Sequence, residues 1–191
     1  KWRGQVGIAK PLAGTTATHA ACLFAAWGDD EAKAFFTKLK ANAKVVSGNK
    51  QVAQDVAAGK LAVGLTDTDD AFIEKYVNRK GTDRDRIAII FPDQGEDQMG
   101  ALFIPNTLAI IRGGPNPEHA QRLVNYLLQG RVEELLATSD SAQFPLSSEA
   151  KFTSPAAPED PLKRMDIDFA DALEKWDEAM EFLTEEFATA D

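Results

Sequence analysis

Cysteine is almost absent from this sequence of 191 residues, which contains only Cys22. One cysteine excludes an internal disulfide bond and any zinc site built on several thiolates, and it leaves the compartment open because large secreted proteins often lack disulfides. Basic clusters are missing too, since 21 Lys and Arg residues stand against 30 Asp and Glu residues, for a net charge of -9. Nucleic-acid binding needs clustered cations to displace counterions, so nucleic acid is excluded as a partner.

Long apolar runs are also lacking. The longest, residues 101–111, is interrupted by Pro105 and Asn106 and falls short of the ~20 residues that span a bilayer. The sequence opens on Lys1-Trp2-Arg3 without an initiator Met or a signal-peptide pattern. We therefore expect an excised fragment whose signal peptide or lipid anchor lay in missing N-terminal sequence.

Short apolar strands alternate with helical patterns along the first half of the chain. The expected strands are residues 5–9, 44–46, 61–65 and 87–91, and the expected helices are residues 16–27, 30–42, 50–58 and 71–78. This alternation predicts an α/β fold, a three-layer sandwich in which helices flank a mostly parallel sheet. The C-terminal helices are added to this sandwich.

The second half of the chain is predicted to leave this sandwich and then to come back to it. A long extended run at 101–112 precedes a predicted helix pair at 118–129 and 131–138, and apolar residues from Phe169 to Phe187 repeat every three or four positions, as in an amphipathic helix. We divide the chain into a ligand-binding lobe at 1–107, a return strand and helix pair at 108–146, an extended proline-rich connector at 147–165, and a helix at 166–190 that packs back on the lobe.

Three loops each follow a predicted strand and introduce a predicted helix, which places them at one edge of a parallel sheet. They comprise Ala13, Gly14, Thr15 and Thr16; Ser47, Gly48 and Asn49; and Asp67, Thr68, Asp69 and Asp70. Helix starts offer unpaired N–H groups, and Thr or Asn adds directed hydrogen bonds, so the first two loops suit an anion or an oxygen-rich ligand. The alternative is that their Thr and Asn side chains only cap their own helices, with Thr15 or Thr16 as the N-cap of the first.

The third loop has a different character because it holds three carboxylates within four residues. Such groups repel one another and are difficult to bury without a cation nearby. Carboxylate oxygens are hard ligands that suit Mg, Ca, Mn or ferric iron, so Asp69 and Asp70 are candidate metal ligands. The alternative is again N-capping, with the spare acids resting on the helix dipole.

An apolar strand that ends in Asp-x-Asp also resembles the first motif of Mg-dependent haloacid-dehalogenase-like phosphatases. In that alternative Asp67 is the nucleophile and Asp69 the general acid. The residues after Asp69 break the continuation of the motif, and neither His19 nor His119 lies near a nucleophile pattern. We therefore expect a binding protein rather than an enzyme.

The order of several segments carries a broader resemblance. The segments are residues 2–11, 14–16, 47–53 and 59–71, followed by 105–110 and 117–128. In this order they resemble periplasmic ferric-iron-binding proteins of ABC importers, within the type 2 periplasmic binding protein superfamily, over roughly residues 2 to 150. The resemblance implies that the chain is the second of two lobes that close around a solute, and that residues 108–146 normally pack on the missing first lobe.

The resemblance also implies a ligand set. Ala13, Gly14 and Thr15 lie where the family binds a synergistic anion, and Asn49 and Asp67 lie at further cleft positions. Asp69 and Asp70 stand where iron-binding members carry paired tyrosines, which leaves ferric iron, another cation or an amine-bearing molecule as the solute.

The implied protein is a receptor of an importer. It requires no cofactor beyond a bound metal ion and its anion, delivers its solute to a membrane permease, is extracytoplasmic, and is a monomer at full length. The effector-binding domain of a transcription regulator shares the lobe architecture and is a further alternative, although the sequence contains no basic helix-turn-helix.

Overall fold

The computed structural model describes residues 2–148 and 150–188. The chain forms two compact units. One unit contains the residues up to Ile104 together with those from Leu162 onward, and the other is Pro105–Pro161. Among the described residues, no helix is both long and apolar enough to cross a membrane.

The first unit is built on a three-stranded sheet of β1 (Val6–Ala9), β2 (Ala43–Val46) and β3 (Val63–Leu65). The strand order is β2-β1-β3, and both neighbours run parallel to β1, with Val6 opposite Ala43 on one side and opposite Val63 on the other. The predicted parallel α/β architecture is therefore present. Each strand leads into a helix, so the three strand-to-helix loops lie at the same edge of the sheet.

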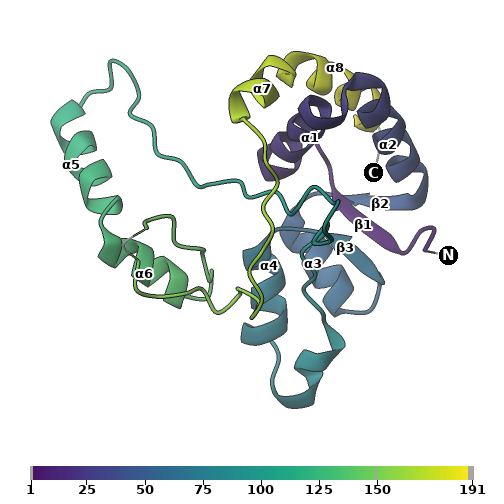
Figure 1. The fold of residues 1–191 in the computed structure, drawn as a ribbon, viewed down its shortest axis with the longest axis horizontal. Coiled ribbons are helices and arrows are strands. Elements are labelled where there is room, and N and C mark those ends of the chain that lie inside the picture. The colour runs from purple at the N-terminus through teal and green to yellow at the C-terminus, as the bar shows by residue number, and fades with distance from the viewer. Residues whose placement is uncertain (1, 149, 189–191) are drawn as a thin grey trace. The chain divides into compact units, whose positions relative to one another are not determined.

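Four helices that come from both ends of the chain lie on one side of the sheet (Figure 1). They are α1 (Gly14–Trp27), α2 (Asp29–Asn42), α7 (Phe169–Glu174) and α8 (Trp176–Phe187), and α7 and α8 pack on α1 and α2. Their shared interior is aromatic: Phe24, Phe36 and Phe187 are almost fully buried, and the ring of Phe36 lies 6.3 Å from that of Phe24 and 6.4 Å from that of Phe187. This packing joins the C-terminal helices to the sheet domain and holds α1 in place.

The other face of the sheet is covered by α3 (Asn49–Ala57), and two glycines of the strands make room on this face. A Cβ atom added at Gly7 would lie 2.4 Å from a side-chain carbon of Leu61, and one added at Gly64 would lie 2.5 Å from a side-chain carbon of Val52. Both contacts are too short for any side chain. Glycine at position 64 therefore lets α3 approach β3 closely, and glycine at position 7 leaves room for the side chain of Leu61, which follows α3.

After β3 the chain forms α4 (Thr68–Phe72), the π-helical turn η1 (Ile73–Val77) and the 3₁₀ helix η2 (Gly81–Arg86). The strand predicted at 87–91 does not form. Ile90 in this segment is 81% exposed, and an extended segment becomes a strand only where a neighbouring strand pairs with it. The prediction was wrong because apolar residues alone favour a strand at 87–91, whereas no neighbouring strand is present in the described structure to pair with it.

The single C-terminal helix predicted at 166–190 is in fact two helices, and residues 189 and 190 lie outside the described part of the chain. The break falls at Lys175, whose N–H bonds back to the carbonyls of Asp171 and Leu173 and whose ammonium bonds to the carboxylate of Asp29 in α2. The turn lets α7 pack on α1 while α8 packs on both α1 and α2. Tertiary packing thus divides a stripe that is continuous in the sequence.

Two passages of the first unit that are distant in sequence run side by side. Ala101 and Arg164 form a parallel bridge, and the side-chain amide of Gln94 both accepts from the N–H of Lys163 at 2.8 Å and donates to its carbonyl at 3.0 Å. Gly100 has a φ of +88°, and a Cβ there would lie 2.7 Å from the backbone of Arg164. Glycine is therefore required for this close approach.

The second unit contains the predicted helix pair, observed as α5 (Pro117–Leu127) and α6 (Gly130–Thr138). Val132 and Ala137 of α6 are buried, whereas α5 has no buried residue among those described. Leu123, Leu128 and Leu135 are exposed. The unit therefore presents a large apolar surface to solvent.

Candidate functional site

The three predicted loops meet at the carboxyl-terminal edge of the sheet. Thr15 and Thr16 open α1 after β1, Asn49 opens α3 after β2, and Asp67 precedes α4 after β3. We call the hydrogen-bonded group of Thr15, Thr16, Asn49 and Asp67 the sheet-edge junction. All four side chains are half-buried.

Asp67 is the acceptor at the centre of the sheet-edge junction. The hydroxyl of Thr15 lies 3.0 Å from both carboxylate oxygens, and Nδ2 of Asn49 donates to Oδ2 at 2.7 Å. Asn49 Nδ2 also donates to the oxygen of Thr15 at 3.0 Å, while Asn49 Oδ1 accepts from the hydroxyl of Thr16 at 3.2 Å. Side chains from three loops thereby fix one another, and their relative positions need no ligand to be set.

These side chains do not cap their own helices, so the capping alternative was wrong for them. The N-cap positions are Ala13 for α1, Gly48 for α3 and Asp67 for α4, and none of the three caps its helix through a side-chain hydrogen bond. Among the described residues, the first-turn N–H groups of α1 and α3 have no side-chain acceptor. They leave partial positive charge at the edge of the sheet, where an anion is favoured.

Carboxylates crowd beside this positive end. Oxygens of Asp67, Asp69 and Asp70 lie within 4.8 Å of one another, and all three residues are half-buried. Burial raises the pKa of Asp70 above its ordinary value, and the charges of Asp69 and Asp67 raise it further, although Lys50 opposes them. A cation placed here would relieve both the repulsion and the burial cost. Three carboxylate oxygens form a donor set that suits a hard metal ion or an ammonium group.

The remaining predicted residues shape the loops without joining the hydrogen-bond network. Gly14 has a φ of +63°, which favours glycine in the turn into α1. Ala13 and Ser47 are exposed, Gly48 has extended backbone, and Thr68 is the first residue of α4. Each of these residues therefore lies where a strand gives way to a helix, and Gly14 and Thr68 are already helical.

Thr66 and Lys50 belong to this site and were not predicted. The hydroxyl of Thr66 donates to the carbonyl of Asn49 at 2.9 Å and so ties the end of β3 to the start of α3. Lys50 contributes the positive charge that opposes the raised pKa of Asp70. Thr66 stands beside Asp67 and Lys50 beside Asn49, so adjacency to predicted site residues was the available signal.

The phosphatase alternative gains nothing from this geometry. A nucleophilic carboxylate must present a lone pair to its substrate, whereas both oxygens of Asp67 accept hydrogen bonds from Thr15, and Oδ2 also accepts one from Asn49. Asp67 holds loops together. In the part of the chain that the structure describes, the carboxylates of the neighbouring Asp69 and Asp70 accept no side-chain hydrogen bond, and they lie close to each other as like charges.

Comparison with known sequences gives a family match over most of the chain. Residues 1–173 match the family described as bacterial extracellular solute-binding protein. No curated protein sequence matches the chain.

Comparison with solved structures gives the fold. The apo ferric ion-binding protein A of Pasteurella haemolytica is similar, with a TM-score of 0.81 at 20% identity over 99% of this chain and 59% of that one. The ferric binding protein of Campylobacter jejuni has a TM-score of 0.78 at 21% identity, over 97% and 59%. Apo FutA2 from Synechocystis PCC6803 has a TM-score of 0.73 at 15% identity, over 97% and 60%. The chain therefore spans about three fifths of the length of these structures, and at this identity the likeness establishes the fold alone.

Proposed function

We propose, on the premise that this chain belongs to the family of bacterial extracellular solute-binding proteins, that it is the solute-binding lobe of a receptor for an ABC importer. The sheet-edge junction is the observation that carries the proposal. It joins loops from three strands through side chains that leave their own helices uncapped. A site held rigid in this way, with free backbone donors beside crowded carboxylates, is organised to receive a charged solute.

The solute that fits best is a hard metal cation or an amine held together with an anion. Asp69 and Asp70 would bind the cation, and the helix starts at Ala13 to Thr15 and at Asn49 would bind the anion. Ferric iron is the foremost candidate, because the similar solved structures are described as ferric-ion-binding proteins. Acidic side chains stand where the family resemblance implies tyrosines, so the ligands here would be carboxylate oxygens instead of phenolates.

The same proposal extends to location and partners. A receptor of this family works outside the cytoplasm and transfers its solute to a permease in the membrane. Neither an enzymatic reaction nor regulation of transcription is favoured by any feature of the site. We further propose that the exposed apolar surface of α5 and α6, including Leu123 and Leu135, packs on another lobe of the full-length receptor.

Calorimetric titration of the full-length protein tests the proposal. We expect saturable heat with ferric citrate, or with one of manganese, calcium or spermidine, and at least about tenfold weaker binding after Asp69→Asn/Asp70→Asn, because two charged contacts are lost. The matched control is Asp30→Asn/Glu31→Gln, an exposed acidic pair in the first turn of α2, which should leave affinity unchanged. Absence of heat with all these solutes and with phosphate would contradict the receptor assignment.

A further inference from the structure

The helix that carries Asp69 and Asp70 changes its hydrogen-bond pattern partway along. In α4 the N–H of Ile73 still bonds to the carbonyl of Asp69, four residues back. The helix continues without a break as the π-helical η1, after which the N–H of Asn78 bonds to the carbonyl of Ile73, five residues back, at 2.9 Å. We call η1 the wide turn, because a π-helical turn holds one residue more than an α-helix between the same ends. Such turns are rare and are often found at functional sites.

Both ends of the segment made by α4 and the wide turn are held by contacts outside it. At the start, Asp67 is fixed in the sheet-edge junction by the hydroxyl of Thr15 and the amide of Asn49. Beyond the end, the guanidinium of Arg79 donates to the carbonyl of Ala57, the last residue of α3. The extra residue is therefore confined between fixed ends, and what can change is where along the segment the wide turn lies.

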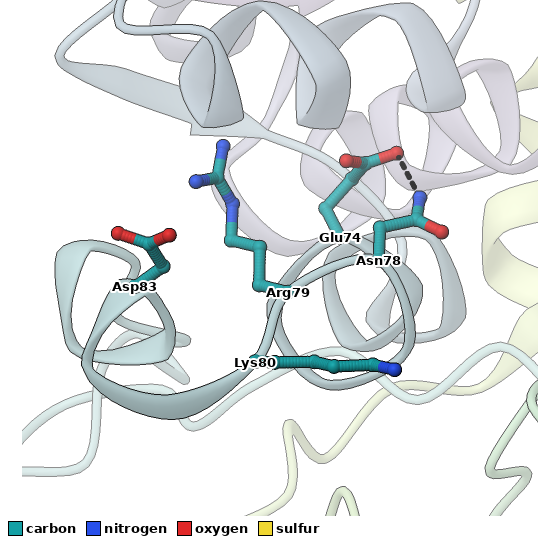
Figure 2. A pocket seen from close by; sticks show the side chains of 5 residues that line it. All are labelled: Glu74, Asn78, Arg79, Lys80 and Asp83. Atoms are coloured by element: carbon teal, nitrogen blue, oxygen red, sulfur yellow. Dashed lines mark hydrogen bonds between the residues drawn. The ribbon is translucent and has the colours of Figure 1, made fainter.

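The wide turn is loosely packed where it now lies. Its residues Tyr76 and Val77 are 36% and 37% exposed, and none of its residues is buried. An open pocket of about 420 Å³ borders it, lined by Glu74, Asn78, Arg79, Lys80 and Asp83 (Figure 2). A shift of the wide turn therefore uncovers little apolar surface and has space beside it.

Movement of the wide turn toward Asp67 has a defined result in the helix. Each residue that it passes takes the place of the residue before it in the sequence, a rotation of about 100° around the helix axis. Ile73 would take the place of Phe72, the buried residue of α4. Because one apolar side chain replaces another, burial at that place is largely retained.

The same movement changes the crowding of the carboxylates. Oxygens of Asp67, Asp69 and Asp70 now lie within 4.8 Å of one another. After the movement Asp70 would take the place of Asp69, and Ala71 would take the place of Asp70, so that one carboxylate leaves the group. Repulsion between the carboxylates favours the shifted arrangement, whereas a bound cation favours the observed one because it attracts all three.

We propose that this segment is a two-position device that captures and releases the solute. The observed arrangement holds Asp69 and Asp70 beside Asp67 and binds the cation, and movement of the wide turn to the start of α4 lets the cation go. The device rests on the proposed function, since it regulates the same site. Asp67 stays in the sheet-edge junction in both arrangements, so the site is adjusted without loss of its hydrogen-bonded frame.

The first test is NMR relaxation dispersion on the isotope-labelled full-length protein without solute, which detects exchange between arrangements on the microsecond to millisecond timescale. We expect exchange at the amides of residues 69–78. Deletion of Val77 removes the extra residue and should abolish the exchange, whereas the matched control Val77→Ala keeps the residue count and should retain it. Ile73→Gln places a polar group in the buried position of the shifted arrangement and should also suppress the exchange.

The second test is calorimetric titration with whichever of ferric citrate, manganese, calcium and spermidine gives saturable heat with the wild type. Deletion of Val77 should tighten binding by about threefold, because the arrangement that binds is then the only one populated. Val77→Ala should bind as the wild type does.

The outcomes separate this device from the receptor proposal. Absence of exchange in the wild type would overturn the device and leave the receptor proposal intact, and this measurement does not depend on whether the deletion variant folds. Exchange that persists after deletion of Val77, or equal affinity of that variant and the wild type, would overturn the device in the same way. Absence of heat with every solute would overturn both proposals, since the device would have nothing to release.

Discussion

Two regions of the molecule differ in how their residues are held. One is the aromatic interior between α1, α2 and α8, which depends on apolar burial, and the other is the sheet-edge junction, which depends on hydrogen bonds between loops. In the interior, Phe24, Phe36 and Phe187 bury the faces that their helical spacing predicts. Nearby, Asp168 accepts from the N–H of Ala170 at 2.8 Å and caps α7. At the junction, Thr15 and Asn49 stand at helix starts and yet bond across loops.

The difference separates stability from function. Burial of aromatic surface stabilises the fold whatever solute is present, because the apolar surface leaves water on folding. The junction and the acidic residues beside it instead retain uncapped helix starts and crowded carboxylates, which cost stability without a ligand. The molecule therefore follows local rules where it needs only to fold and departs from them where we propose that it binds.

The largest expected effect is in the interior. Phe24→Ala should lower the free energy of unfolding by about 4 kcal/mol, since it removes a fully buried ring and leaves a cavity. Urea denaturation measures the loss. Phe169→Ala, at a ring that is 38% exposed, is the control and should cost less than half as much. Equal losses would show that the interior is not the main source of stability.

A smaller effect is expected at the capped helix. Asp168→Ala should cost about 1 kcal/mol, because the N–H of Ala170 loses its acceptor. Thermal unfolding measures the change, and Asp166→Ala, at an exposed acid two residues earlier, serves as the comparison with little expected effect. If the two variants were equally stable, capping would not distinguish α7 from the helices at the junction.

The smallest effect has the opposite sign and lies beside the junction, at Asp70. The pKa of Asp70 is raised by burial and by Asp69 and Asp67, so its ionised form is the less favoured one in the folded protein. The stability that protonated Asp70 contributes to the folded protein is fully present below the ordinary pKa of about 4, and it is lost as the pH rises through the raised pKa. Asp70→Asn should therefore stabilise the ligand-free protein by about 0.5 kcal/mol at pH 7 and by almost nothing at pH 3.

Urea denaturation of Asp70→Asn at a series of pH values checks this sign. The same variant should weaken cation binding, so that stability and affinity move in opposite directions. A loss of stability at pH 7 would mean that Asp70 is held by donors rather than crowded by charges, and the contrast between the two regions would disappear.

Most of the fold and the location of the site were open to prediction from sequence. Periodic hydrophobicity fixes helices such as α2 and α6 within one or two residues, because local burial patterns repeat with the helix. The convergence of Thr15, Asn49 and Asp67 followed from parallel strands, since equivalent loops share one edge. The missing strand at 87–91 and the break at Lys175 could not be predicted, because both depend on packing partners that are distant in sequence.

The sequence by itself determined the α/β class, the order of the elements and the three loops that form the candidate site, because each depends on residue type and short-range spacing. Tertiary structure alone decided what the loop residues do. Whether Thr15 caps α1 or bonds to Asp67 depends on a partner 52 residues away, and the raised pKa of Asp70 depends on how its neighbours are buried. Hydrogen bonds and charges act over a few ångströms in space, and only the folded chain sets those distances.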